Sequence, residues 1–445
     1  MDRDKKAVWG WALYDWANSA FATTVMAGFF PVFFKQYWSY GADVNVSTAQ
    51  LGFANSIASL LVALMAPLLG AIADRASARK KFLIFFAYLG VLMTAALFLV
   101  GKGDWAMAIF VYVMGIIGFS GANVFYDSLL PVVATEDRVD AVSSFGYSLG
   151  YLGGGVLFLF NVAMTLMPQR FGLPDATAAV RFSFLSVALW WGLFAVFTIL
   201  WVREKGDACE KKSDGNAVAA GFGQLLGTFR QLRNMKTIFL FLAAYWFYID
   251  GVDTIIRMTV DYGLSLGFEA NDLIVALLVV QFVGFPAALL FGRLGQCWGV
   301  KKSIFLAIGI YMGITLGGAM ITRKEEIYIF AVAVGLVQGG IQALSRSYYS
   351  RLIPKGKAAE YYGFYNMLGK FAAILGPALM AAVGLIVRQV AMPDMPSAEK
   401  ILEVGQLASR WGIGSILILF MVGALLLCFV DEQEGRAQAQ LLASD

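Results

Sequence analysis

Long apolar runs recur along the whole chain, and each is close to the length of a helix that crosses a membrane. A spanning helix needs roughly 20 predominantly apolar residues. Runs of this kind, bounded by charges or by Pro and Gly clusters, predict helices near residues 9–35, 48–73, 82–100, 105–129, 143–166 and 181–202. Six more are predicted near residues 237–260, 270–292, 303–321, 327–350, 361–387 and 410–430. The pattern therefore predicts an all-α membrane protein with twelve transmembrane helices.

A polar stretch over residues 203–236 separates the two sets of six helices. Its first part, REKGDACEKKSDGN, has the composition of a flexible linker, whereas residues 218–232 have helical spacing and are expected to lie along the membrane surface. The chain is thus expected to divide into an N-terminal six-helix bundle over 1–202, this linker, and a C-terminal six-helix bundle over 237–445.

The two halves repeat each other. GAIADRASARKK at 70–81 closes the second predicted helix, and GRLGQCWGVKK at 292–302 closes the eighth, at an offset of 222 residues. YDSLLP at 126–131 and YSRLIP at 349–354 close the fourth and tenth helices at an offset of 223. Two matches at nearly one offset indicate duplicated, pseudo-symmetric halves, which place a solute path at their interface, opened alternately to either side.

Basic residues are distributed unequally between the two sides of the membrane. Alternate assignment of the loops puts 22 Lys and Arg on the side that holds both termini and the linker, and 9 on the other side. Because cytoplasmic loops carry an excess of Lys and Arg, both termini and the linker are expected in the cytoplasm. The start MDRDKKAVWGW has no small-residue cleavage site, so the first helix should stay attached in a bacterial cytoplasmic (inner) membrane.

Composition excludes several classes of protein. Only 14% of residues are charged, against about a quarter in globular proteins, and the net charge of +4 is too weak to indicate nucleic-acid binding. The sequence has no histidine, which argues against His-based metal sites and Ser-His catalysis, so we expect no enzyme, no metal and no cofactor. Carboxylates must carry any proton chemistry. Cys209, Cys297 and Cys428 lack metal-site spacing and are expected to be free thiols.

GAIADRASARKK resembles the signature loop between helices 2 and 3 of the major facilitator superfamily. The matching positions are Gly70, Asp74, Arg75, Arg79 and Lys80, with Ser77 in place of the usual second Gly. The resemblance implies two six-helix bundles and a role for these residues in conformational gating, because in that superfamily the Asp meets the start of helix 11 and holds the outward-open state. The second copy has Gln296 where Asp is expected, so such a latch is one-sided. The alternative is a solvated basic loop.

Longer motifs resemble the vacuole effluxer-like branch of this superfamily, also called the unknown major facilitator family. They are WALYDWANSAFATT at 11–24, VFYDSLLP at 124–131, YWFYIDGVDTI at 245–255, QGGIQALSRSYYSRLIP at 338–354 and GFYNMLGKFAAILGP at 363–377. The resemblance implies export of small molecules, which are amino acids for the fungal vacuolar relatives.

Charges inside the predicted helices indicate where the solute path lies, since they are costly in the apolar layer and normally face a partner or a water-filled cavity. The seventh helix holds Asp250, Asp253, Arg257 and Asp261 at intervals that place them on one face. Asp253 and Arg257 are spaced to pair, either structurally or as part of the solute site. Asp250 is then left as a carboxylate in a low dielectric, which suits proton uptake and release.

Other polar residues lie in the helices expected to line the path or beside them. They are Asp15, Asn18, Asn123, Asp127, Gln338, Gln342, Arg346 and Lys370. Counted from the predicted cytoplasmic ends, Asp15 and Lys370 are about 9 to 14 Å deep, and Arg346 and Asp127 are nearer the surface. We therefore expect these four to form a cytoplasmic gate, although Arg346 and Lys370 are equally suited to solute contact.

The sequence as a whole predicts a secondary active transporter that exports a small polar or amphoteric solute by alternating access, coupled to protons through Asp250 or Asp15. Two alternatives use the same scaffold. A lipid translocator would favour an apolar groove open to the bilayer over a charged stripe, and a non-transporting sensor would call for a soluble signalling domain. The expected partners are the solute, a proton and the lipid bilayer, and the protein is expected to act as a monomer without nucleic acid.

Overall fold

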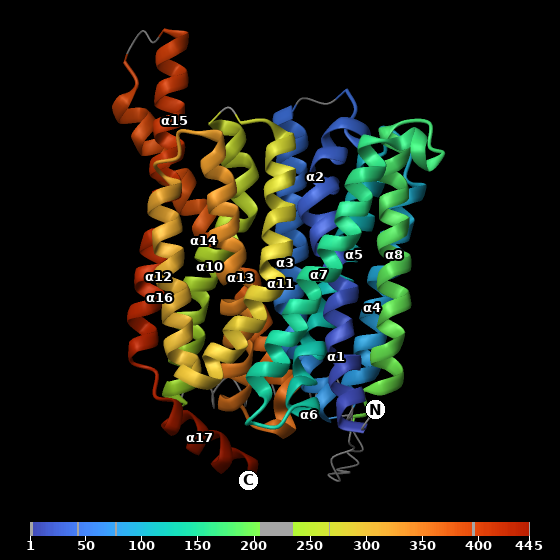
Figure 1. Ribbon diagram of the computed structural model, residues 1–445, viewed down its shortest axis with the longest axis vertical. Helices are drawn as coiled ribbons and strands as arrows, with labels where there is room; N and C mark the ends of the chain where they lie inside the picture. The colour runs from blue at the N-terminus through green and yellow to red at the C-terminus, as the bar shows by residue number, and fades with distance from the viewer. Residues whose placement is uncertain are drawn as a thin grey trace.

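A computed structural model describes residues 3–41, 44–75, 78–204, 235–266, 268–393 and 397–444. Within these ranges the chain forms a bundle of long helices that run roughly side by side (Figure 1). Twelve of its helical segments are long and apolar enough to cross a membrane, which confirms the predicted number. The surface helix expected at 218–232 lies outside the described residues.

The N-half, as we call the part through α8, contains six of these segments. They are α1 (Arg3–Ala20) continued by η1 (Phe21–Phe29), α2 (Phe30–Phe33) and η2 (Phe34–Trp38); α3 (Val44–Arg75); α4 (Arg79–Ala96) with η3 (Leu97–Leu99); α5 (Trp105–Ser128) followed by α6 (Leu130–Val133); α7 (Val139–Leu166), followed by η4 (Pro168–Phe171); and α8 (Ala176–Trp201). The two π-helical stretches of the first segment, η1 and η2, are unusual, because π-helix is rare and often occurs at functional sites.

The C-half contains the other six. They are α10 (Lys236–Ser265), α11 (Ala270–Trp298), α12 (Val300–Gly318), α13 (Lys324–Leu352), α14 (Ala358–Ala391), which follows η5 (Lys355–Lys357), and α15 (Ala398–Ser415) continued by α16 (Leu417–Cys428). A last helix, α17 (Glu432–Ser444), lies beyond the end of the bundle, at the same end as the N-terminus of α1 (Figure 1).

The twelfth segment begins much earlier than the sequence predicts. The hydropathy pattern places its start at 410, whereas α15 begins at Ala398 and projects beyond the bundle (Figure 1). The Ser397 side chain accepts a hydrogen bond from the Lys400 N–H and so caps this start. Hydropathy detects only the part of a helix that lies in lipid, so the polar first turns of α15 escape it.

Each half has its own apolar core. In the N-half the core contains Trp11 and Trp191, and in the C-half it contains Tyr248, Tyr311 and Phe420. The halves meet mainly along four helix pairs, which are α3 with α14, α7 with α11, α7 with α13 and α5 with α14. Residues of these pairs, and of the helices beside them, are therefore the ones that can respond when one half moves against the other.

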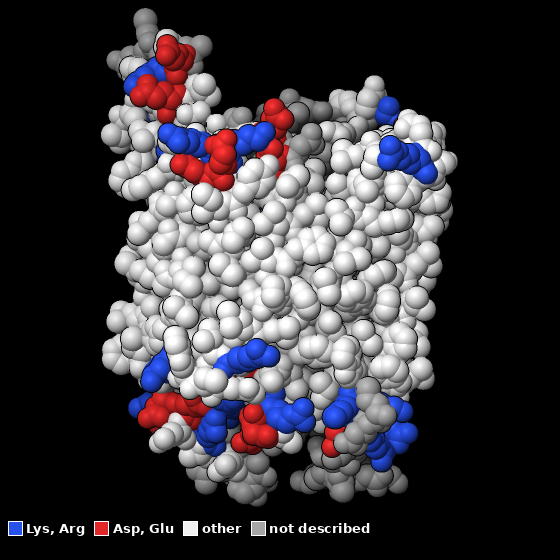
Figure 2. All heavy atoms as spheres, viewed as in Figure 1, with Lys and Arg blue, Asp and Glu red and all other residues white. Residues whose placement is uncertain are grey.

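Charged side chains gather at the two ends of the bundle, and the face shown in Figure 2 is uncharged between them. Exposed side chains include many large apolar ones, such as Leu189, Leu316 and Leu425, which suits contact with lipid. We call the end where α1 begins and α17 lies the basic end, and the opposite end the distal end.

Candidate functional site

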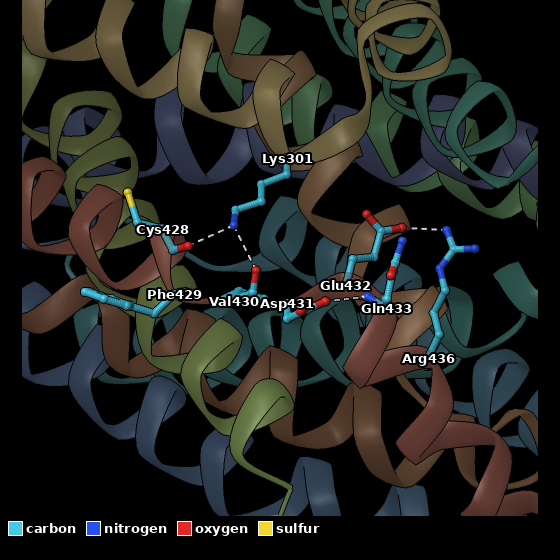
Figure 3. Close-up of a pocket in the computed structure, with 8 residues that line it drawn as sticks. All are labelled: Lys301, Cys428, Phe429, Val430, Asp431, Glu432, Gln433 and Arg436. Carbon is cyan, nitrogen blue, oxygen red and sulfur yellow. Dashed lines mark hydrogen bonds and ion pairs between the residues drawn. The ribbon is translucent and has the colours of Figure 1, made fainter.

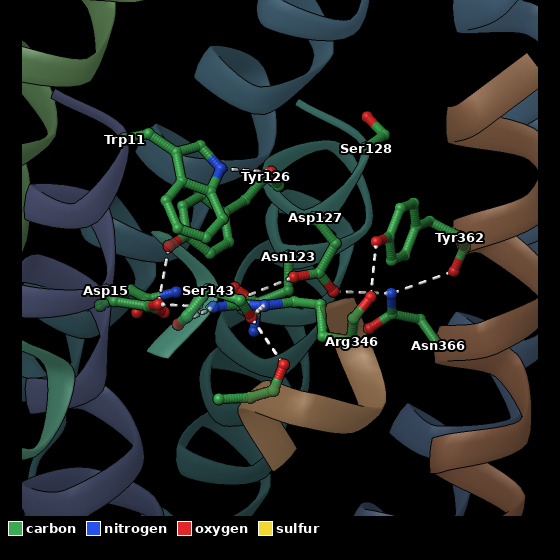
Figure 4. A network of polar contacts seen from close by, with 12 residues as sticks. Trp11, Asp15, Asn123, Tyr126, Asp127, Ser128, Ser143, Arg346, Tyr362 and Asn366 are labelled. Carbon is green, nitrogen blue, oxygen red and sulfur yellow. Dashed lines mark hydrogen bonds and ion pairs between the residues drawn. The ribbon is translucent and has the colours of Figure 1, made fainter. Parts of the chain in front are cut away.

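Arg346 on α13 is the centre of a polar network that joins the two halves toward the basic end (Figure 4). Its side chain is 2% exposed. Nη1 donates to Asp127 Oδ1 at 3.2 Å, and Nη2 lies 3.5 Å from Asp15 Oδ2. Nε donates to Ser143 Oγ, and Nη2 donates to the Ser143 carbonyl, both at 2.9 Å. One guanidinium of the C-half thus binds groups on α1, α5 and α7 of the N-half, and these four residues form the Arg346 network.

Aromatic rings surround this network. The Arg346 guanidinium lies 4.7 Å from the Trp11 ring, 4.3 Å from the Tyr147 ring and 5.4 Å from the Tyr126 ring. The Tyr126 hydroxyl also donates to Asp15 Oδ2 at 2.6 Å, and its ring stacks on Trp11. Rings at these distances attract the cation and exclude water, so the ion pairs are stronger than pairs at a protein surface.

A second helix of the C-half, α14, also reaches the network. Asn366 Nδ2 donates to Asp127 Oδ2 at 3.1 Å and to the Tyr362 carbonyl at 3.0 Å. The Tyr362 hydroxyl donates to the Arg346 carbonyl at 3.0 Å. Asp127 is therefore bound by α13 and α14 at the same time, so that a movement of either helix changes the contacts of its carboxylate.

Asp74 of α3 contacts the start of α14, nearer the basic end than the Arg346 network. Its two carboxylate oxygens accept the backbone N–H groups of Ala359 at 3.1 Å and Glu360 at 2.8 Å. Arg79 donates to the same carboxylate and to the Gly356 carbonyl, so it also joins the halves. A carboxylate at a helix N-terminus satisfies free N–H groups and complements the helix dipole. This contact therefore favours the closed basic end.

Another residue of the signature loop, Lys80, contacts the N-half. Lys80 Nζ donates to the Val202 carbonyl at 2.8 Å, so it closes the end of α8. Arg75 is the last residue of α3, and its side chain lies outside the part of the chain that is described. Gly70 contributes by its small size, since a Cβ there would lie 2.2 Å from the Ala359 carbonyl oxygen. Only glycine lets α3 and α14 approach this closely.

A third inter-half contact lies at the basic end itself. Arg351 of α13 forms an ion pair with Asp140 of α7, and its Nη1 lies 3.3 Å from Glu432 Oε1 of α17. Glu432 also pairs with Arg436. The last helix of the chain thus shares a cation with the contact that joins the halves.

The base of α17 borders a surface pocket of about 740 Å³ (Figure 3). Lys301 Nζ donates to the carbonyls of Cys428 at 3.0 Å and Val430 at 2.8 Å, which fixes the end of α16. The charged residues of the lining, two basic and two acidic, balance each other. This pocket lies outside the helix interface and is no candidate for the solute site.

The remaining predicted charges lie deeper in the bundle, and the structure corrects two expectations about them. Lys370 is not part of the gate: α14 begins at 358, so Lys370 is about 18 Å along it, away from the Arg346 network. Among the described residues, Asp253 and Arg257 form no ion pair within 4 Å, although their spacing would permit one. The charges of Arg257 and Lys370 act on the Asp253 carboxylate from a greater distance.

Asp253 and Lys370 are partly buried, and Arg257 is exposed. Among the described residues neither Asp253 nor Lys370 has an ion-pair partner within 4 Å, and charges in the apolar layer normally face a partner or a water-filled cavity.

The uncharged polar candidates are distributed over both halves. Asn18 Nδ2 donates to Asn123 Oδ1 at 2.6 Å within the N-half. The Tyr151 hydroxyl lies 3.3 Å from Gln342 Oε1, which links α7 to α13. Gln338 is one turn from Gln342 on α13 and is partly buried. These residues lie between the Arg346 network and the distal end of the bundle, as Asp253 does.

Asp250 has partners that charge spacing did not reveal. It is fully buried, and its oxygens accept the backbone N–H groups of Leu375 at 3.1 Å and Gly376 at 2.8 Å. Thr254 Oγ1 donates to the same carboxylate at 3.2 Å. A carboxylate engaged in this way is suited to holding α14, and its role in proton coupling stays a prediction.

Sequence reasoning missed several contributors to the gate. Ser143 and Trp11 gave no signal, because a serine or an aromatic residue in an apolar helix is ordinary. Asp140 and Arg351 lie at helix ends, where charges are expected in any membrane protein. Asn366 was detectable, since an amide inside the eleventh apolar run is as costly as the residues that were selected.

Comparison with known proteins gives consistent results. A family model described as vacuole effluxer Atg22 like matches residues 3–391. The chain is 38% identical over 442 residues to an uncharacterized MFS-type transporter, YxiO, of Bacillus subtilis, covering 99% of this chain and 98% of the relative. It is 22% identical over 488 residues to autophagy-related protein 22 of Yarrowia lipolytica, covering 91% of this chain and 79% of the relative.

Solved structures of transporters share the fold. The proton:xylose symporter XylE, bound to 6-bromo-6-deoxy-D-glucose, matches with a TM-score of 0.68 and 16% identity over 99% of this chain and 98% of that one. The human organic anion transporter MFSD10 matches with a TM-score of 0.64 and 14% identity over 96% of this chain and 100% of that one. The predicted major facilitator fold of twelve transmembrane helices is confirmed.

Proposed function

Because this chain belongs to the vacuole effluxer Atg22-like family of major facilitator superfamily transporters, we propose that it exports amino acids or similar amphoteric solutes in exchange for protons. Proteins of this kind are multi-pass membrane transporters and not enzymes, and they bind small solutes between their halves. The description of the family as effluxers supports the outward direction. The solute and the coupling ion are argued below from the charges of this chain.

The solute site is formed by Asp253 on α10 and Lys370 on α14. These opposite charges are partly buried and are not bonded to each other, so an amino acid fits them with its ammonium on Asp253 and its carboxylate on Lys370. Arg346 was the other candidate for the carboxylate, but its donors are occupied by three residues of the N-half. This pair of uncommitted charges is the observation that carries the proposal.

The coupling site is the Arg346 network. Two carboxylates, Asp15 and Asp127, face one guanidinium, so either can take a proton while the other keeps its ion pair. Protonation weakens the contacts between the halves, which favours opening of the basic end. Loss of the proton at that end restores the pairs and closes it. Proton entry and solute exit then alternate, as an exchanger requires.

The basic end is the cytoplasmic end in this proposal. The excess of Lys and Arg at the termini supports this orientation. The structure, which is joined at the basic end by the Arg346 network and by Asp74, then corresponds to a state closed to the cytoplasm.

Transport by purified protein in liposomes with an acidic interior tests both sites. A panel of radiolabelled amino acids is offered outside, and at least one is expected to accumulate. Asp253→Asn and Lys370→Gln should abolish its uptake and its counterflow. Asp127→Asn should retain counterflow but lose the accumulation driven by the pH gradient. Asp137→Asn, which changes an exposed loop carboxylate, serves as the matched control and should behave as the wild type.

The outcomes separate the parts of the proposal. If no amino acid moves, the solute class is wrong. If Lys370→Gln transports normally, the site is elsewhere, and if Asp127→Asn still accumulates solute, the Arg346 network does not couple the proton.

A further inference from the structure

The contact between Asp250 and α14 occurs at a weak point of that helix. The N–H groups of residues 375 and 376 lie in the interior of α14, which is one continuous helix over Ala358–Ala391. Here both are bound by the Asp250 carboxylate, and the next residue, Pro377, has no N–H. At residues 375, 376 and 377 the backbone N–H is therefore either bound by another helix or absent.

The geometry is that of a capped helix start. A carboxylate that accepts two successive backbone N–H groups is the usual arrangement at the first turn of a helix. Asp74 binds the real start of α14 in the same way and at nearly the same distances. The contact with Asp250 thus lies between the part of α14 over 358–374, which we call the first segment, and the part that begins at Pro377.

The close approach of α10 and α14 depends on Gly376. A Cβ at this position would lie 1.8 Å from Thr254 Oγ1 and 2.8 Å from Asp250 Oδ1. No side chain fits without separating the helices. Asp250, Gly376 and Pro377 therefore act at the same point of α14, the step between residues 376 and 377.

The first segment carries every gate and solute contact that α14 makes. Asp74 binds its first turn, Asn366 donates to Asp127, and Lys370 is the proposed solute contact. Movement of this segment as a unit would link the occupancy of the solute site to the state of the gate.

We propose that Asp250 is a positioning residue that anchors α14 to α10 at the Gly376–Pro377 step, so that segment 358–374 swings about this step when the basic end opens. The inference rests on alternating access as proposed above, but it assigns no proton and no solute to Asp250. Without the carboxylate, α10 no longer holds these two N–H groups, the step loses its anchor, and the swing becomes slower.

The test uses Asp250→Asn and Gly376→Ala in a background whose three cysteines are replaced by serine. Spin labels on Lys81→Cys and Lys302→Cys, exposed positions of the two halves at the basic end, report its opening without any solute. Both variants should lose most of the open population under acidic conditions. Pro286→Ala in α11, a membrane-helix proline away from this step, is the control and should keep the wild-type distances.

Transport separates a hinge from a coupling site. With the amino acid that the wild type accumulates, both variants should slow initial uptake roughly tenfold and leave KM and the final accumulation ratio unchanged. A purely structural role would lower thermal stability without changing the label distances. If Asp250→Asn alone loses accumulation while Gly376→Ala is normal, Asp250 is the coupling residue and the inference is wrong. The spin labels still decide the question if no amino acid is transported.

Discussion

Arg346 shows how much a single residue can do when it is buried between two moving parts. Its planar guanidinium makes four contacts with the N-half, through three different nitrogen atoms. Lysine has one nitrogen and cannot match this fork. Its role in the closed state therefore depends on shape as well as on charge.

We predict that Arg346→Lys weakens the closed state by about 3 kcal/mol, roughly a hundredfold in the ratio of closed to open molecules, because it leaves buried carboxylates poorly paired. Spin-label distances across the basic end measure this ratio. Arg181→Lys is the control, since Arg181 donates to the Phe98 carbonyl within the N-half and should not change the distances. Unchanged distances in Arg346→Lys would show that the network does not hold the gate.

Gly70 permits a second prediction at the same scale. Gly70→Ala should open the basic end and destabilise the protein by about 1–3 kcal/mol, because the new Cβ would meet the backbone of Ala359, which cannot move aside. Gly309→Ala, where nothing lies within 4 Å, should be neutral or stabilising by up to about 1 kcal/mol. Thermal unfolding and the same label pair measure both effects, and equal behaviour of the two variants would contradict the packing argument.

Among the helices, α14 and α17 have the most distinctive roles. The first segment of α14 connects the gate to the proposed solute site, whereas α17 contributes an ion pair with Arg351. The two partners of Arg351 differ in exposure, at 2% for Asp140 and 27% for Glu432. The ion pair of Arg351 with Asp140 should therefore contribute more to the stability of the closed state than the ion pair of Arg351 with Glu432.

We predict that Asp140→Asn destabilises the closed state by about 3 kcal/mol, because it removes a buried partner that joins the halves. Glu432→Gln should cost less than about 1 kcal/mol, as expected of a partly exposed pair. The two variants are compared by the distance distribution at the basic end. A larger effect of Glu432→Gln would show that α17 is the stronger latch.

On the scale of the whole molecule, the orientation in the membrane decides whether the described state faces out or in. Cys297 and Cys428 are free and exposed, and both lie toward the basic end. A membrane-impermeant thiol reagent should label Cys297 in inside-out vesicles and not in intact cells. Arg170→Cys, in the loop at the distal end, should label in intact cells and serves as the control. The reverse pattern would invert the orientation and with it the direction of transport.

The sequence by itself determined the number of membrane segments, the duplication of the halves and the family. Each of these depends on local composition or on short motifs, which can be recognised in the sequence without knowledge of the tertiary packing. It also identified the charges that must be buried, including Asp15, Asp127 and Arg346, because a charge in an apolar run is costly wherever its partner lies. The division at residues 203–236 stays a prediction.

Only the tertiary structure decided which groups meet. Arg346 lies more than 200 positions from Asp127 and Ser143 in the sequence, and spacing along one helix carries no information across that separation. The same limit explains why Asp253 and Arg257 were expected to pair and why Lys370 was placed in the gate. The partners of Asp250 are backbone N–H groups, which every residue except proline possesses, so nothing in the sequence marks the two that another helix reaches.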